Sequence, residues 1–321
     1  MRTLVPAVWA AAALALLAAS GPPAHAGVTL RAGDVVMVDS YVYPSPVPAV
    51  WRLDPVTLDT TLIASGGLLV HPDRVAVDGS GRVVVADRVS GVVAIDPATG
   101  AQTLVASPAG LGGRTARGIC RDPNGGLYLT VALNGSGALF HLDPATHEVR
   151  VVADGGLLVA PVCVTVGPGG ALFVGDMSLV TPVSSGGIVK VTPTGEQSLV
   201  ATTGAALAAP FDIAITPDGW IWTAQWGALS RRGASFMRTR LTDGYTEAMS
   251  YSRAQGITID AGGNIYLADC SSVSFDCFRR FVWMWPGGLT INLPSGAMAV
   301  VPASQTAARR TTWGALKTLY R

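Results

Sequence analysis

The sequence predicts an all-β fold, a six-bladed β-propeller with four-stranded blades, from three observations. A turn glycine followed by a short apolar strand recurs at Gly33, Gly81, Gly126, Gly170, Gly219 and Gly263. The successive differences are 48, 45, 44, 49 and 44 residues, a period typical of propeller blades. With 38 Gly, 21 Pro, 49% apolar and 13% charged residues, the composition favours short buried strands joined by tight turns.

Each repeat supplies the four strands of one blade. The first strand precedes the glycine, and we expect it at residues 74–77, 118–121, 163–166, 212–215 and 256–259. The second follows the glycine, as at 82–86 and 220–224. The third runs into Asp-Pro-x-Thr turns at 54–57, 96–99 and 143–146, where Pro presets φ and Asp can accept backbone hydrogen bonds. The fourth is expected at 102–106, 149–153 and 197–201.

The two ends of the chain are predicted to share a blade. The first repeat lacks a first strand, whereas residues 296–301 look like a first strand without a turn glycine after it. We therefore expect this C-terminal strand to complete the N-terminal blade and to close the ring over residues 27–302.

The segments outside the propeller are a signal peptide and a basic tail. Arg2, the apolar run 8–19 and the Ala-His-Ala motif at 24–26 predict a signal peptide over residues 1–26. We expect a secreted or periplasmic protein with no membrane span after cleavage. Residues 303–321 contain no acidic residue and form a basic C-terminal tail.

The sequence predicts that ligands bind at the upper face, the side on which the first strand of each blade begins. The loops 39–50, 176–186, 225–234 and 269–280 lie there and are longer than hairpins require. Tyr41, Tyr43 and Trp226 in these loops are candidate ligand-binding residues. Trp220 and Trp222 alternate along one strand, and we expect them to pack between blades.

The cysteines fall into two pairs. Cys270 and Cys277 flank a short Ser-rich segment, and we expect them to form a disulfide in an exported protein. Cys120 and Cys163 lie in equivalent first strands, where either a bond or two buried thiols is consistent with the sequence.

The strand after the turn glycine carries a resemblance to a known superfamily. The run Gly-x-Val/Ile-Tyr/Val-Val/Leu-Ala-Asp is seen at 81–87, 170–176 and 263–269. It resembles the NHL-repeat and gluconolactonase-like superfamily of six-bladed β-propellers, and the likeness covers nearly all of the mature chain. Such propellers include lactonases, lyases and binding modules. The aspartate ending each run, as in Asp39, Asp87, Asp176 and Asp269, is expected to accept backbone hydrogen bonds in the following loop.

An enzyme of this kind would hold a divalent cation in the central channel. The first strands begin with Asp73, Asp212 and Gln255, which could bind Ca²⁺. Arg117 in the same ring would oppose a cation or neutralise a carboxylate. His71, beside Asp73, is a candidate acid or base, as in a streptogramin-lyase-like mechanism, with Arg117 assisting.

The leading hypothesis is an exported β-propeller that binds a ligand or protein partner through its upper face without catalysis. The partner is an unidentified small molecule, carbohydrate or protein, no cofactor is expected, and the protein is expected to be a monomer. A net charge of +1 disfavours nucleic acid. The alternative is a divalent-metal-dependent lactonase-like hydrolase or a streptogramin-lyase-like enzyme with its site in the central channel.

Overall fold

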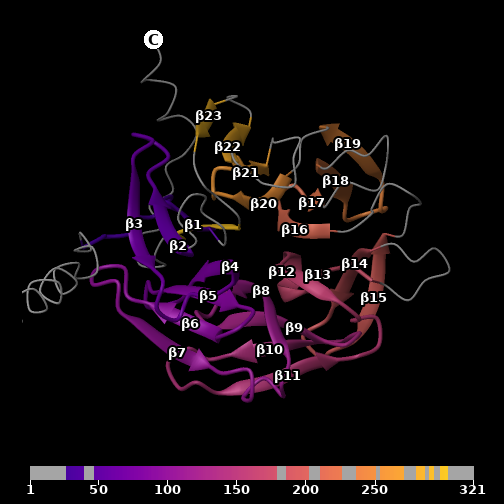
Figure 1. Ribbon diagram of the computed structural model, residues 1–321. Helices are drawn as coiled ribbons and strands as arrows, with labels where there is room; N and C mark the ends of the chain where they lie inside the picture. Colours follow the sequence, from indigo (N-terminus) through magenta and orange to yellow (C-terminus); the bar gives the residue numbers. More distant parts are fainter. Residues whose placement is uncertain are drawn as a thin grey trace, which may run out of the picture.

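The computed structural model shows an all-β propeller built from four-stranded antiparallel sheets (Figure 1). It describes residues 27–39, 47–178, 186–201, 210–225, 236–250, 254–270, 280–285, 289–292 and 297–302. The predicted signal peptide and basic tail lie outside these ranges. In the described part of the chain, no helix is long and apolar enough to span a bilayer.

Five of the sheets are each made of four strands that are consecutive in the sequence. The second sheet contains β4 (Pro72–Val77), β5 (Val83–Asp87), β6 (Gly91–Ile95) and β7 (Gln102–Ala106). The third contains β8 (Thr115–Arg121), β9 (Leu127–Leu133), β10 (Ser136–Leu142) and β11 (Val149–Asp154). The fourth contains β12 (Pro161–Val166), β13 (Leu172–Asp176), β14 (Gly187–Val191) and β15 (Gln197–Ala201), with a 3-10 turn at Pro168–Gly170.

The two remaining sheets of this type are formed by the C-terminal repeats. The fifth contains β16 (Pro210–Ile215), β17 (Trp220–Gln225), β18 (Phe236–Arg240) and β19 (Thr246–Ser250). The sixth contains β20 (Ala254–Ile259), β21 (Ile265–Cys270), β22 (Arg280–Trp285) and β23 (Leu289–Asn292). In these five sheets the first strand begins two or three residues earlier than the sequence indicates.

The first sheet joins the two ends of the chain. It contains β1 (Val35–Asp39), β2 (Ala49–Leu53) and β3 (Thr60–Ser65), and its innermost strand is β24 (Met298–Val300). β24 runs antiparallel to β1, with Val35 opposite Val300 and Met37 opposite Met298. The expected pairing between the C-terminal strand and the N-terminal sheet is therefore present.

The core lies between the sheets. Among the described residues, each pair of neighbouring sheets shares an apolar cluster, including Met37, Tyr266 and Met298 between the sixth sheet and the first. Trp222 packs against Ile257 and Leu267 of the next sheet, so its expected inter-blade packing is confirmed. Strands such as β5 and β6 are buried along their whole length because both faces of each sheet are covered.

The turn glycines have positive φ in five of the six expected positions: Gly33, Gly81, Gly170, Gly219 and Gly263. The prediction is wrong by one residue in the third repeat, where Gly125 has φ +97° and closes the turn onto the carbonyl of Asp122. Gly126 is constrained in a different way. A Cβ at this position would lie 2.8 Å from Nε2 of His141, so this imidazole, which contacts Asp122, would have to shift.

Candidate functional site

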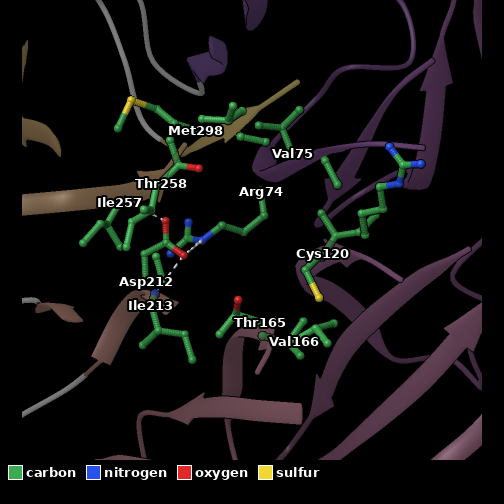
Figure 2. Close-up of a pocket in the computed structure, with 18 of the residues that line it drawn as sticks. Arg74, Val75, Cys120, Thr165, Val166, Asp212, Ile213, Ile257, Thr258 and Met298 are labelled. Carbon is green, nitrogen blue, oxygen red and sulfur yellow. Dashed lines mark hydrogen bonds and ion pairs between the residues drawn. The ribbon is translucent and has the colours of Figure 1, made fainter. Parts of the chain in front are cut away.

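A cavity of about 290 Å³ lies along the centre of the propeller (Figure 2). It is lined by residues of the innermost strand of every sheet, β4, β8, β12, β16, β20 and β24. Most of the residues that line it are apolar, but Arg74, Arg121 and Asp212 carry charge, and Thr165 and Thr258 contribute hydroxyl groups. The innermost strands therefore surround a channel with only a few charged or hydroxyl-bearing side chains.

Arg74 and Asp212 face each other across the channel (Figure 2). Nε of Arg74 lies 3.5 Å from Oδ1 of Asp212. The Asp212 carboxylate also accepts backbone N–H groups from Ile213 and from Ile257 of the next sheet, at 3.1 and 3.0 Å. The Arg74 guanidinium donates to the carbonyls of Asp73 and Phe211 and lies over the Phe211 ring. The Arg74 side chain therefore crosses the channel from β4 to β16, where these contacts fix it beside Asp212.

Asp73 is bound by two further guanidinium groups. Nε and Nη2 of Arg88 donate to its two carboxylate oxygens, each at 2.9 Å. Nε of Arg117 donates to Oδ2 at 2.8 Å. Arg88 follows β5 and Arg117 lies in β8, so two sheets contribute to this contact. We call Asp73, Arg74, Arg88, Arg117 and Asp212 the rim cluster, because Asp73, Arg117 and Asp212 lie near the upper ends of innermost strands.

Burial and pairing act differently on the acids and bases of the rim cluster. Burial tends to raise the pKa of Asp73, but the guanidinium groups of Arg74, Arg88 and Arg117 outweigh it and hold this pKa below its ordinary value. Burial raises the pKa of Asp212, and the attraction of Arg74 compensates only in part. Burial is the main cause that lowers the pKa of Arg117, and repulsion by Arg88 and Arg74 lowers it further. Pairing with Asp73 opposes this shift but does not cancel it.

The aspartates that recur at the end of the second strands have a structural role. Asp87, fully buried, accepts backbone N–H groups from Val70, His71, Val89 and Ser90. Asp176 likewise accepts those of Val159, Ala160 and Ser178. Each carboxylate fastens the loop before the first strand to the loop after the second. The expectation that these aspartates bond the loop backbone is confirmed at both positions.

Two valines beside Asp87 project from the upper face. Val70 and Val89, whose backbone N–H groups both bond to Asp87, are 50% and 57% exposed. Arg88, which precedes Val89 in the same loop, has a side chain that is 31% exposed. The upper face of the second sheet therefore combines exposed apolar groups with a guanidinium of the rim cluster.

The structure brings together only some of the predicted site residues. Arg117 contacts Asp73, whereas Asp212 is paired with Arg74. His71 is exposed, and its described contacts are through its backbone, which bonds to Asp87 and accepts from the N–H of Arg88. The sequence interpretation missed Arg74 and Arg88. Two signals were available in the sequence: the Asp73-Arg74 pair at the start of an otherwise apolar strand, and an arginine, Arg88, directly after the repeated Ala-Asp.

The predicted metal and aromatic sites are described only in part. The side chain of Gln255 lies outside the described residues, as do Tyr41, Tyr43 and Trp226. Within the described ranges no group of three or more His, Cys, Asp or Glu side chains could hold a metal ion. Both carboxylates of the predicted set are in contact with guanidinium groups, and this pairing competes with cation binding.

The cysteines of the innermost strands are free thiols. Cys163 is buried, and Cys120 lines the channel wall. Burial raises the pKa of both thiols, which makes them poor nucleophiles. Of the two alternatives, the structure has the two thiols rather than a bond. Cys277 and the side chain of Cys270 lie outside the described residues, so their disulfide stays a prediction.

Solved structures share the fold at low sequence identity. A chain of a nidogen/laminin complex is 14% identical with a TM-score of 0.63, and the match covers 85% of this chain and 100% of that one. TolB from Acinetobacter baumannii is 13% identical with a TM-score of 0.62, covering 84% and 67%. Regucalcin, a calcium-binding protein from Agrobacterium tumefaciens, is 15% identical with a TM-score of 0.55, covering 75% and 84%. No protein-family model and no curated protein matches the chain.

Proposed function

We propose that this chain is an exported six-bladed β-propeller that binds a ligand or protein partner through its upper face, without catalysis. The observation that carries the proposal is the rim cluster, in which Asp73 and Asp212 are held by arginines at the upper mouth of the channel. Carboxylates occupied in this way are poorly placed to act as metal ligands or general bases, whereas paired guanidinium groups are common at binding surfaces.

The exposed valines near Asp87 also support binding at the upper face. Val70 and Val89 stand on loops that are fixed by four hydrogen bonds, so an apolar contact there is preorganised. A propeller of similar fold occurs in a nidogen/laminin complex, which supports the idea that this architecture can dock a protein. Tyr41, Tyr43 and Trp226 are further candidates on the same face.

The proposed ring has six blades, one for each sheet, and the first sheet closes it through β24. This strand contacts both β20 and β4, the innermost strands of the sheets on either side. A closed ring would hold the loops of all six blades around one channel mouth, which is what an upper-face site requires.

A metal-dependent enzyme is the second candidate, because regucalcin, of similar fold, is a calcium-binding protein. In this case Asp73, Asp212 and Gln255 would hold Ca²⁺, with His71 or Arg117 assisting. Cation binding would require Asp73 and Asp212 to leave their arginines. A melting temperature that rises with CaCl₂ in the wild type, but not in Asp212→Ala, together with hydrolysis of a simple lactone, would replace the binding proposal by this one.

The binding proposal is tested by comparing a variant of the upper face with a variant of the opposite face. The immobilised full chain is exposed to the exported proteins and small molecules of the cells that produce it, and bound material is identified by mass spectrometry. The Val70→Glu/Val89→Glu variant should lose this material. The control is Val56→Glu, because Val56 is 88% exposed in an Asp-Pro-x-Thr turn of the opposite face. Equal retention by both variants would contradict an upper-face site.

A further inference from the structure

We propose that the rim cluster binds a small molecule through an oxyanion, a carboxylate or phosphate group, which contacts Arg88 and Arg117 at the upper mouth of the channel. This inference rests on the proposed upper-face binding and specifies the chemistry of its ligand.

The first argument is the charge balance. The rim cluster contains three guanidinium groups and two carboxylates, which leaves one positive charge in excess. Arg121 adds another farther along the channel wall. The side chains of Arg74, Arg88 and Arg117 are 6%, 31% and 20% exposed, so water solvates their charges only in part. A bound anion would compensate this excess, whereas a cation would increase it.

The second argument is the supply of donors. Arg88 uses Nε and Nη2 on Asp73, and Arg117 uses Nε on the same carboxylate. Among the described residues, Nη1 of Arg88 and both Nη groups of Arg117 make no hydrogen bond to an acceptor. Asp73 therefore fixes two planar guanidinium groups while leaving terminal N–H groups for a second oxyanion. Guanidinium groups bind carboxylates and phosphates through pairs of such N–H groups.

The third argument is the direction of access. The Asp73 side chain is 8% exposed, and both arginines that hold it are more exposed than it is. The accessible part of this contact is thus its cationic part. The cavity of about 290 Å³ adjoins this contact only through Arg74 and Asp212, because Asp73, Arg88 and Arg117 do not line it. The proposed oxyanion site is therefore the accessible side of Arg88 and Arg117 and not the cavity itself.

The experiment measures thermal unfolding of the full chain with lactate, inorganic phosphate or uncharged lactamide, at ionic strength held constant with NaCl. We expect a saturable rise in melting temperature with lactate, phosphate or both, and none with lactamide. A response to lactate alone assigns a carboxylate ligand, and a response to phosphate alone assigns a phosphate ester. If neither anion acts beyond NaCl, the inference is overturned.

Two variants locate the effect. Arg117→Gln should weaken the apparent affinity about tenfold or more, the usual effect of losing a charge-assisted hydrogen bond. The matched control, Arg114→Gln, removes an arginine outside the rim cluster that pairs with Asp154, and it should leave the affinity unchanged. Equal affinities in the two variants would overturn the inference. If Arg117→Gln does not fold, Arg88→Gln replaces it with the same expectation.

The two proposals fail separately. Loss of captured material in Val70→Glu/Val89→Glu without any oxyanion response would overturn only the oxyanion inference. An oxyanion response that depends on Arg117, with no material captured through the upper face, would leave the oxyanion site and contradict the partner proposal.

Discussion

Asp73 and Asp87 are buried aspartates on neighbouring strands of one sheet, yet they differ in what they bind. Asp87 accepts four backbone N–H groups from two loops, and Asp176 makes the same kind of contacts in the fourth sheet. Asp73 is bound by the side chains of Arg88 and Arg117. The carboxylate that recurs with the repeat holds the frame, whereas the irregular one holds two partly exposed guanidinium groups.

The strongest test of this difference is Asp87→Ala. The change removes the acceptor of four backbone N–H groups, and those in the interior cannot all find water. We expect a loss of about 3 to 5 kcal/mol in the free energy of unfolding, measured by urea denaturation. Asp143→Ala is the control, because Asp143 accepts two backbone N–H groups in an exposed turn and its loss should be smaller. Equal losses would mean that burial of Asp87 contributes nothing.

Asp73→Ala should have a smaller effect that an anion can reverse. The change leaves two guanidinium groups without their carboxylate, and because Arg88 and Arg117 are partly solvated we expect a loss of about 2 kcal/mol. Excess phosphate at constant ionic strength should restore part of it. The same addition should not rescue Asp87→Ala, since no anion can replace an acceptor inside the loops. Rescue of both variants to the same extent would remove the distinction.

The contributions of Asp73 and Asp212 to the free energy of unfolding should change with pH in opposite directions. This is the smallest of the three expected effects. The pKa of Asp73 is lowered from its ordinary 3.8, so its contribution to stability is present above that pH and is lost as pH falls through the lower folded value. The pKa of Asp212 is raised, so its contribution is present below pH 3.8 and is lost as pH rises through the higher folded value.

The measurement is the difference in unfolding free energy between the wild type and each Asn variant. The difference for Asp73→Asn should shrink as the medium is made more acidic than pH 3.8. That for Asp212→Asn should shrink as the pH rises above 3.8. If the two differences changed with pH in the same direction, the causes given for the two pKa shifts would be contradicted: guanidinium partners for Asp73 and burial for Asp212.

Much of the frame was predictable because it repeats. The spacing of the turn glycines and the alternation of strands and Asp-Pro-x-Thr turns predict four-stranded sheets, and the surplus strand near Met298 predicts the pairing of the two chain ends. The one-residue error at Gly126 arises because consecutive glycines cannot be distinguished by spacing. The tertiary structure adds that a side chain at Gly126 would press on His141.

The rim cluster was predictable only in part. Asp73, Arg117 and Asp212 were identified from their place at the start of first strands, and neutralisation of a carboxylate by Arg117 was one of the alternatives. Arg74 and Arg88 were missed, because the reach of a long side chain does not follow from its position in a repeat: Arg74 crosses the channel to Asp212 of the fifth sheet, and Arg88 turns back to Asp73 of its own sheet.

The repeating unit follows from local sequence, since turn glycines, prolines and apolar strands act locally and recur every 44 to 49 residues. The tertiary structure decided which charges meet. Asp73 lies in the second sheet and Arg117 in the third, while Arg74 and Asp212 come from the second and fifth sheets and face one channel. Such pairings depend on the arrangement of sheets around the axis, which brings together residues that are far apart along the chain.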